Sequence, residues 1–124
     1  MAEFQIKKLN TIVVPVKDLE RSMTFYKDVL HLSQDFVENG MASYSVGYGE
    51  AKVTVLLHLI DKPEPVEKGI VIEFEVDNLN KTVSAIREAG GQIVQEPIDR
   101  EWGVKEAVIA DPDGYKIWMV EPLA

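Results

Sequence analysis

Glu73, His58, Trp102 and Trp118 are the side chains in this sequence best suited to chemistry or ligand binding. The chain has 124 residues, no cysteine and two histidines. The lack of cysteine excludes thiol nucleophiles, thiolate metal sites and disulfides. The remaining chemistry is proton transfer by a carboxylate or an imidazole, and binding of flat or cationic molecules on an indole ring.

The charge of the chain narrows the class of partner. The formal net charge is -8 and 46% of the residues are hydrophobic. A negative surface disfavours nucleic acid and anionic membranes. It suits a cationic ligand, and equally it serves ordinary solubility. No apolar run approaches the roughly 20 residues that span a bilayer, and the first residues have no signal pattern, so we expect a soluble cytoplasmic protein.

The chain nearly repeats itself at a shift of 60 positions. Residues 14–19 match residues 74–79, and each segment leads from an apolar strand into the start of a helix. The sequence therefore predicts one α+β domain over residues 1–124, built from two tandem βαβββ modules. Module 1 is expected at about residues 5–61 and module 2 at about residues 69–124. The proline-containing stretch between them is the candidate linker.

Local patterns indicate where strands, helices and turns begin. Asp18 and Asn78 are predicted to start helices whose apolar stripes cover one face of each preceding strand. Pro15 lacks an N–H group, which predicts that its strand lies at a sheet edge. Asn39-Gly40 predicts a tight hairpin. His31 is expected only to end the first helix, at the position where the second helix has Gly91. The expected face toward the first helix comprises Ile12, Val14 and Val16, and toward the second Ile70, Ile72, Phe74 and Val76.

These segments together resemble the vicinal oxygen chelate superfamily, which holds glyoxalase I, extradiol dioxygenases and the bleomycin resistance proteins. The segments that carry the resemblance are residues 16–22, 25–30, 74–79, 102–103 and 111–117. The resemblance implies a curved, cup-shaped mixed sheet with helices on the outside. It also implies a homodimer in which two chains present two such cups.

In metal-dependent members of this superfamily the cup holds a divalent ion, bound by His or Glu from the first and last strands of each module. Carried onto this sequence, those positions are Thr11, Thr54, Val71 and Trp118. Threonine is a poor ligand for such ions, and Val and Trp offer none. We therefore expect no metal and no cofactor. A shift of two residues would bring Glu73 into this set, and a shift of four would bring His58.

Two of the polar candidates keep alternative roles. Glu73 shares the predicted cup face with Lys116, so it is either one half of an ion pair that is structural or orients a ligand, or a general base whose pKa is raised by burial. His58 is either a histidine at the rim or facing a loop, or a metal ligand or a base.

The aromatic candidates favour a binding function. Trp118 would offer a flat face at the floor of the cup, or would simply fill space. Trp102 would line its mouth. Tyr44 would add to the wall or pack in the core. We expect a metal-independent protein that binds a planar or cationic small molecule, as bleomycin-resistance-type members do. The alternatives are a lyase, isomerase or dioxygenase relative using a shifted metal site or Glu73 as base, and a cup filled by its own side chains.

Overall fold

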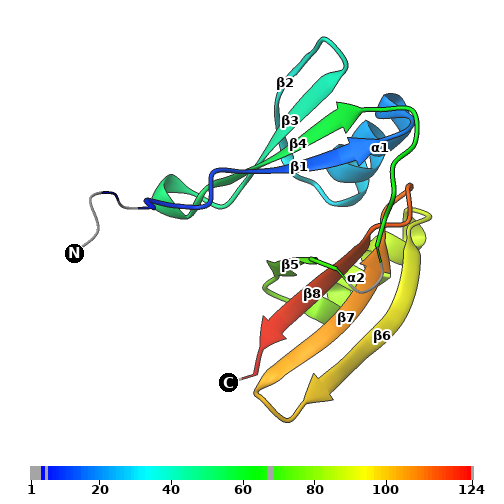
Figure 1. Ribbon diagram of the computed structural model, residues 1–124. Helices are drawn as coiled ribbons and strands as arrows, with labels where there is room; N and C mark the ends of the chain where they lie inside the picture. The colour runs from blue at the N-terminus through cyan, green and yellow to red at the C-terminus, as the bar shows by residue number, and fades with distance from the viewer. Residues whose placement is uncertain (1–3, 5, 67–68, 124) are drawn as a thin grey trace.

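Two four-stranded sheets, each with its own helix, make up the fold (Figure 1). The computed structural model describes residues 4, 6–66 and 69–123. The strand order is β1-β4-β3-β2 in the first sheet and β5-β8-β7-β6 in the second. β1 pairs in parallel with β4, and β5 pairs in parallel with β8. The other strand pairs are antiparallel. The predicted α+β class and the repeated βαβββ order are confirmed.

The elements of the first module are β1 (Thr11–Val16), α1 (Leu19–Thr24), η1 (Phe25–Val29), β2 (Ser33–Glu38), β3 (Met41–Val46), η2 (Gly49–Ala51) and β4 (Val53–Leu59). Asp18 is the N-cap of α1, as predicted, and its side chain accepts a hydrogen bond from the Arg21 N–H. Asn39 and Gly40 form the hairpin turn, both with positive φ, because this turn type matches the strand twist. Pro15 lies in an edge strand, also as predicted.

The first helix closes with a wider turn that the sequence pattern did not reveal. η1 is a π-helical segment that continues α1, and the Leu30 N–H donates to the Phe25 carbonyl five residues back. His31 follows with φ +60, the left-handed conformation that ends the helix. This position confirms the predicted helix-ending role of His31.

The elements of the second module are β5 (Ile72–Glu75), α2 (Leu79–Glu88), β6 (Gln92–Arg100), β7 (Val104–Ala110) and β8 (Lys116–Pro122). Asn78 caps α2 as predicted. The expected contribution of Ile70 to the helix-facing side of the first strand was wrong, since β5 begins at Ile72 and Ile70 is fully exposed. Strand β6 continues to Arg100 through two register shifts.

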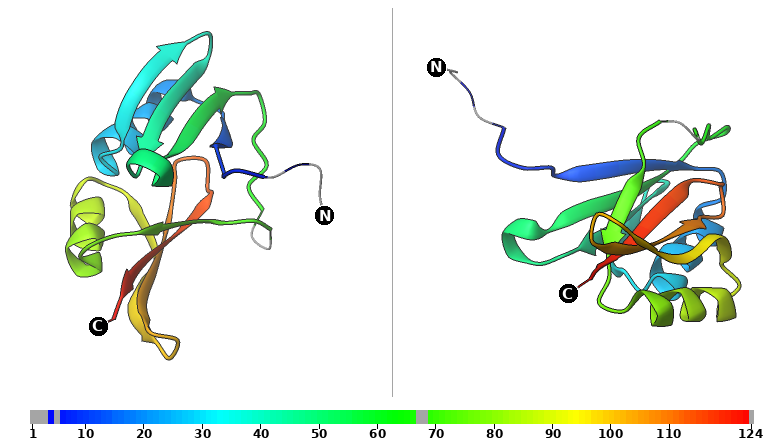
Figure 2. Two further views of the ribbon diagram at one scale, coloured as in Figure 1. Left: turned by 90° about the vertical axis from the view of Figure 1, so that its left-hand side faces the viewer. Right: turned by 90° about the horizontal axis from the view of Figure 1, so that it is seen from below.

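One face of each sheet packs against its helix and forms the core. In β1 the buried side chains are Val14 and Val16, and in α2 they are Leu79, Val83 and Ile86. Figure 2 shows α2 lying along one face of the second sheet. We call the opposite face of each sheet its open face. None of the helices described here is long and apolar enough to cross a membrane.

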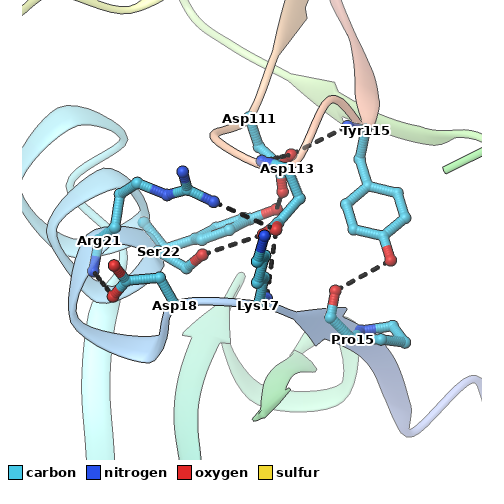
Figure 3. Close-up of polar contacts among 9 residues, drawn as sticks. Pro15, Lys17, Asp18, Arg21, Ser22, Asp111, Asp113 and Tyr115 are labelled. Carbon is cyan, nitrogen blue, oxygen red and sulfur yellow. Dashed lines mark hydrogen bonds and ion pairs between the residues drawn. The ribbon is translucent and has the colours of Figure 1, made fainter. Parts of the chain in front are cut away.

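A cluster of hydrogen bonds joins the modules, where the Asp111–Gly114 turn meets the start of α1 (Figure 3). Asp113 accepts from the Lys17 backbone N–H, the Arg21 guanidinium and the Ser22 hydroxyl at 3.2–3.3 Å. The Tyr26 hydroxyl donates to Asp111 at 2.8 Å. The Tyr115 hydroxyl donates to the Pro15 carbonyl at 2.9 Å. We refer to these contacts as the clasp, because they connect residues about 85–100 positions apart in sequence.

Candidate functional site

The open face of the second sheet carries a row of four side chains that the strand registers place side by side. Glu73 of β5 is opposite Trp118 of β8, Trp118 is opposite Val108 of β7, and Val108 is opposite Gln95 of β6. Neighbouring strands lie about 4.8 Å apart, so the Glu73 carboxylate can reach the edge of the Trp118 ring. The row therefore combines a carboxylate with an aromatic surface.

Trp118 faces away from the helix and keeps part of its ring in solvent. Its neighbours in β8, Ile117 and Met119, are buried against α2, and alternation along a strand sends Trp118 to the other side. Its side chain is 37% exposed. Glu73 is exposed and, among the described residues, no ion pair joins it to Lys116. The Glu73 carboxylate is thus exposed to solvent beside Trp118.

The strand register also shows which side chains lie opposite one another at the positions that the family resemblance assigned to metal ligands. In the first sheet Thr11 is opposite Thr54, as the repeat suggests. In the second sheet Trp118 is opposite Glu73, two residues beyond Val71, which precedes β5. The position across from Trp118 is therefore a carboxylate rather than a valine. A two-residue offset preserves the face, so the sequence pattern alone could not exclude it.

The candidates of the first sheet lie on its open face and carry modest chemistry. The Thr11 hydroxyl accepts from the Asn10 amide at 2.9 Å. His58 is exposed near the end of β4, four residues beyond Thr54 and about 13 Å along the strand. That separation keeps His58 away from the Thr11 and Thr54 pair.

Tyr44, Val71 and Lys116 lie outside this row, although Lys116 shares the open face with Trp118, two residues earlier in β8. Tyr44 is fully buried in the core, where its hydroxyl donates to Gln34 at 3.0 Å and burial raises its pKa. Val71 and Lys116 line a cavity of about 330 Å³ that also includes Val13 of β1. This cavity lies between the first strands of the two modules, and its lining does not include Trp118.

A polar network on the same open face was missed by the sequence analysis. Glu106 of β7 is 5% exposed, and one of its carboxylate oxygens accepts from Arg100 Nε at 3.2 Å and from Arg100 Nη2 at 3.0 Å. Arg100 Nη2 also donates to Gln95 Oε1 at 3.3 Å. The guanidinium lies 5.6 Å from the ring centroid of Trp102, which is 65% exposed. Trp102 therefore lies beside a guanidinium whose position is set by its ion pair with Glu106.

The network includes one unsatisfied polar atom. The Gln95 amide nitrogen is buried and has no hydrogen-bond partner among the described residues. An unpaired buried donor costs about 1–3 kcal/mol, so its retention calls for an explanation. The signal available in the sequence was Glu106 itself. It is the charged residue on a face of β7 that it shares with Val104, Val108 and Ala110.

Comparison with known proteins shows the family to which the chain belongs. Residues 8–119 match the Glyoxalase/Bleomycin resistance protein/Dioxygenase superfamily. The chain belongs to this superfamily. A probable lactoylglutathione lyase from Synechocystis is 29% identical over 119 residues, covering 88% of this chain and 91% of that protein. A lactoylglutathione lyase from Escherichia coli O157:H7 is 34% identical over 116 residues, covering 86% of each.

Solved structures of the superfamily have the same fold. A glyoxalase/dioxygenase from Nostoc punctiforme superimposes with a TM-score of 0.81 at 20% identity, covering 100% of this chain and 97% of that one. A superfamily member from Sphaerobacter thermophilus gives 0.72 at 24% identity, covering 94% and 98%. At this level of identity the likeness establishes the fold alone.

The divalent metal of the metal-dependent superfamily members does not fit the side chains at the corresponding positions. Within each module these positions lie on paired strands. The ligands that one module offers therefore do not depend on how the modules pack together. The first module offers two threonine hydroxyls, and the second offers one carboxylate beside an indole. Among the described residues no three His, Cys, Asp or Glu side chains gather as a metal site. Divalent ions of this kind need three or four imidazole or carboxylate ligands.

Proposed function

We propose that this protein is a metal-independent binding member of the superfamily, which holds a planar organic cation against Trp118. The observation that carries the proposal is the pairing of Trp118 with Glu73 on the open face of the second sheet. An indole face attracts a cation by about 0.5–2 kcal/mol, and a carboxylate beside it adds a charge partner. The net charge of -8 favours the approach of a cation.

The ligand is expected to stack on the ring rather than to be transformed. A binding site of this kind combines apolar surface with a few placed polar groups. Val108 flanks Trp118 in its row but is only 9% exposed, so the ring of Trp118 supplies most of the apolar surface. Glu73 supplies the polar group that selects charge. The proposal also includes pairing of two copies, which would set the open faces of different modules together around one ligand.

The first experiment uses N-methylquinolinium, with neutral quinoline as its uncharged counterpart. The chain has two tryptophans, so a Trp102→Phe variant leaves Trp118 as the only indole. Saturable quenching of Trp118 fluorescence by N-methylquinolinium is expected, with weaker quenching by quinoline. Glu73→Gln should lower the preference for the cation several-fold, because the ring remains and the charge is removed. Glu88→Gln, on the last turn of α2, is the control with the same change in net charge.

Isothermal titration calorimetry with Trp118→Leu completes the test, with at least a tenfold loss of affinity expected. Binding of N-methylquinolinium that is unaffected by this substitution would refute the proposal.

The similarity to lactoylglutathione lyases defines the second candidate function. The Glu73 carboxylate lies directly opposite Trp118 and would be the general base in a lyase reaction. The test measures turnover of lactoylglutathione with and without added divalent ions. Turnover that is lost in Glu73→Gln and kept in Glu88→Gln would support the lyase over the binding protein.

A further inference from the structure

We infer that Arg100 and Trp102 form a second subsite on this open face, which binds the oxyanion of a planar aromatic molecule. This subsite rests on the proposed function, which places the ligand on the open face of the second sheet. Arg100 ends β6, and Trp102 lies two residues later in the turn to β7. The guanidinium is 5.6 Å from the Trp102 ring centroid.

The position of the guanidinium is fixed by hydrogen bonds to two side chains, Glu106 and Gln95. The buried Glu106 carboxylate accepts from Nε and Nη2 of Arg100, and the Gln95 carbonyl oxygen accepts from Nη2. Gln95 turns its oxygen toward Arg100 and leaves its own amide nitrogen buried, with no partner in the part of the chain that the structure describes. The side chain is therefore held in one orientation at an energetic cost. Preorganisation of this kind strengthens ligand binding, because the side chain loses less freedom when the ligand arrives.

One edge of the guanidinium remains available for a ligand. Nη1 donates to none of the residues that the structure describes. This nitrogen is not buried and remains in contact with solvent. The Arg100 side chain is 30% exposed. An arginine fork suits carboxylates and other oxyanions, and its planar group packs beside aromatic rings. A ligand oxyanion on Nη1 would place an attached ring against the exposed indole of Trp102.

The two subsites select opposite charges. Glu73 lies beside Trp118, whereas Arg100 lies beside Trp102. Arg100 is opposite Val104 in β7, and Trp118 is opposite Val108, four residues further along the same strand. That spacing is about 13 Å along the sheet. A molecule with an aromatic carboxylate at one end and a cation at the other could occupy both subsites.

The experiment compares 2-naphthoate with neutral 2-naphthalenemethanol by isothermal titration calorimetry. The wild-type protein should bind 2-naphthoate at least tenfold more tightly. Arg100→Lys should reduce that preference about fivefold or more, because lysine keeps the charge and loses the fork. The double variant Arg100→Gln with Glu106→Gln should abolish the preference without leaving a lone buried charge. Arg87→Gln, whose arginine pairs with Glu96 beside α2, should leave it unchanged.

The outcomes separate this inference from the proposed function. Equal affinities of the wild-type protein for the two naphthalene probes, or an unchanged preference in Arg100→Lys, would overturn the subsite. N-methylquinolinium serves as the second probe, and its affinity should be the same in Arg100→Lys as in wild type. If N-methylquinolinium fails to bind while the naphthoate preference holds, the proposed function at Trp118 fails and the oxyanion subsite stands.

Discussion

Asp111 is the residue whose ionisation is most clearly coupled to the fold. Its side chain is buried, and desolvation raises the pKa of the carboxyl, although hydrogen bonds from Tyr26 and from the Tyr115 backbone lower it in part. Desolvation and the nearby Asp111 charge also raise the pKa of Tyr26, so that its hydroxyl remains a donor. Asp111 therefore binds a proton more tightly in the folded than in the unfolded protein.

Asp111→Asn should change the pH dependence of stability in a defined direction. Because the pKa is raised on folding, the contribution of Asp111 to stability is fully present below the ordinary Asp pKa of about 3.9 and is lost as pH rises through the folded pKa. The free energy of unfolding of wild type minus that of Asp111→Asn should fall with rising pH across this window. Urea denaturation at a series of pH values measures it, with exposed Asp99→Asn as control. A difference that grows with pH would contradict the assignment.

At the scale of elements, the end of the first helix carries strain that glycine would relieve. His31 has φ +60, a conformation that costs a residue with a Cβ about 1–2 kcal/mol. His31→Gly should raise the free energy of unfolding by about 0.5–1 kcal/mol, since glycine also has more freedom to lose on folding. Asn39→Gly is the matched control, because Asn39 has φ +49 and the short polar side chain of asparagine can hydrogen-bond locally in this conformation. Chemical denaturation measures both, and no gain for His31→Gly over Asn39→Gly would argue against strain.

The elements that sequence predicted well are those fixed by neighbouring residues. The caps at Asp18 and Asn78 and the Asn39-Gly40 turn depend on local backbone chemistry, and all three are where they were expected. Pairing between distant strands was harder, because an offset of two residues keeps every side chain on its face. The sequence alone therefore could not show that Trp118 is opposite Glu73 and not Val71.

Bulges set a second limit on what the sequence could reveal. Simple alternation puts Gln95 on the same side as Ile93, which packs against the core. A register shift between these two residues instead sets Gln95 opposite Val108. The network of Gln95, Arg100 and Glu106 could therefore not be assembled from spacing alone. Its parts come together only through the irregular path of β6.

At the scale of the whole molecule, the clasp connects two modules that each have their own sheet and helix. Asp113 accepts three hydrogen bonds from residues of the first module, although it belongs to the second. Its carboxylate also lies near the N-terminal turn of α1, where a negative charge is favourable. The clasp should therefore couple the unfolding of the two modules.

Asp113→Ala is expected to separate the unfolding of the modules. Both tryptophans lie in the second module, so tryptophan fluorescence reports that module alone, whereas far-UV circular dichroism reports both. In wild type the two probes should give one coincident urea transition, as a cooperative unit does. In Asp113→Ala the loss of about three hydrogen bonds, at about 1 kcal/mol each, should shift the two midpoints apart. Asp99→Ala, an exposed aspartate in β6, should keep them together, and coincident transitions in Asp113→Ala would show that other contacts couple the modules.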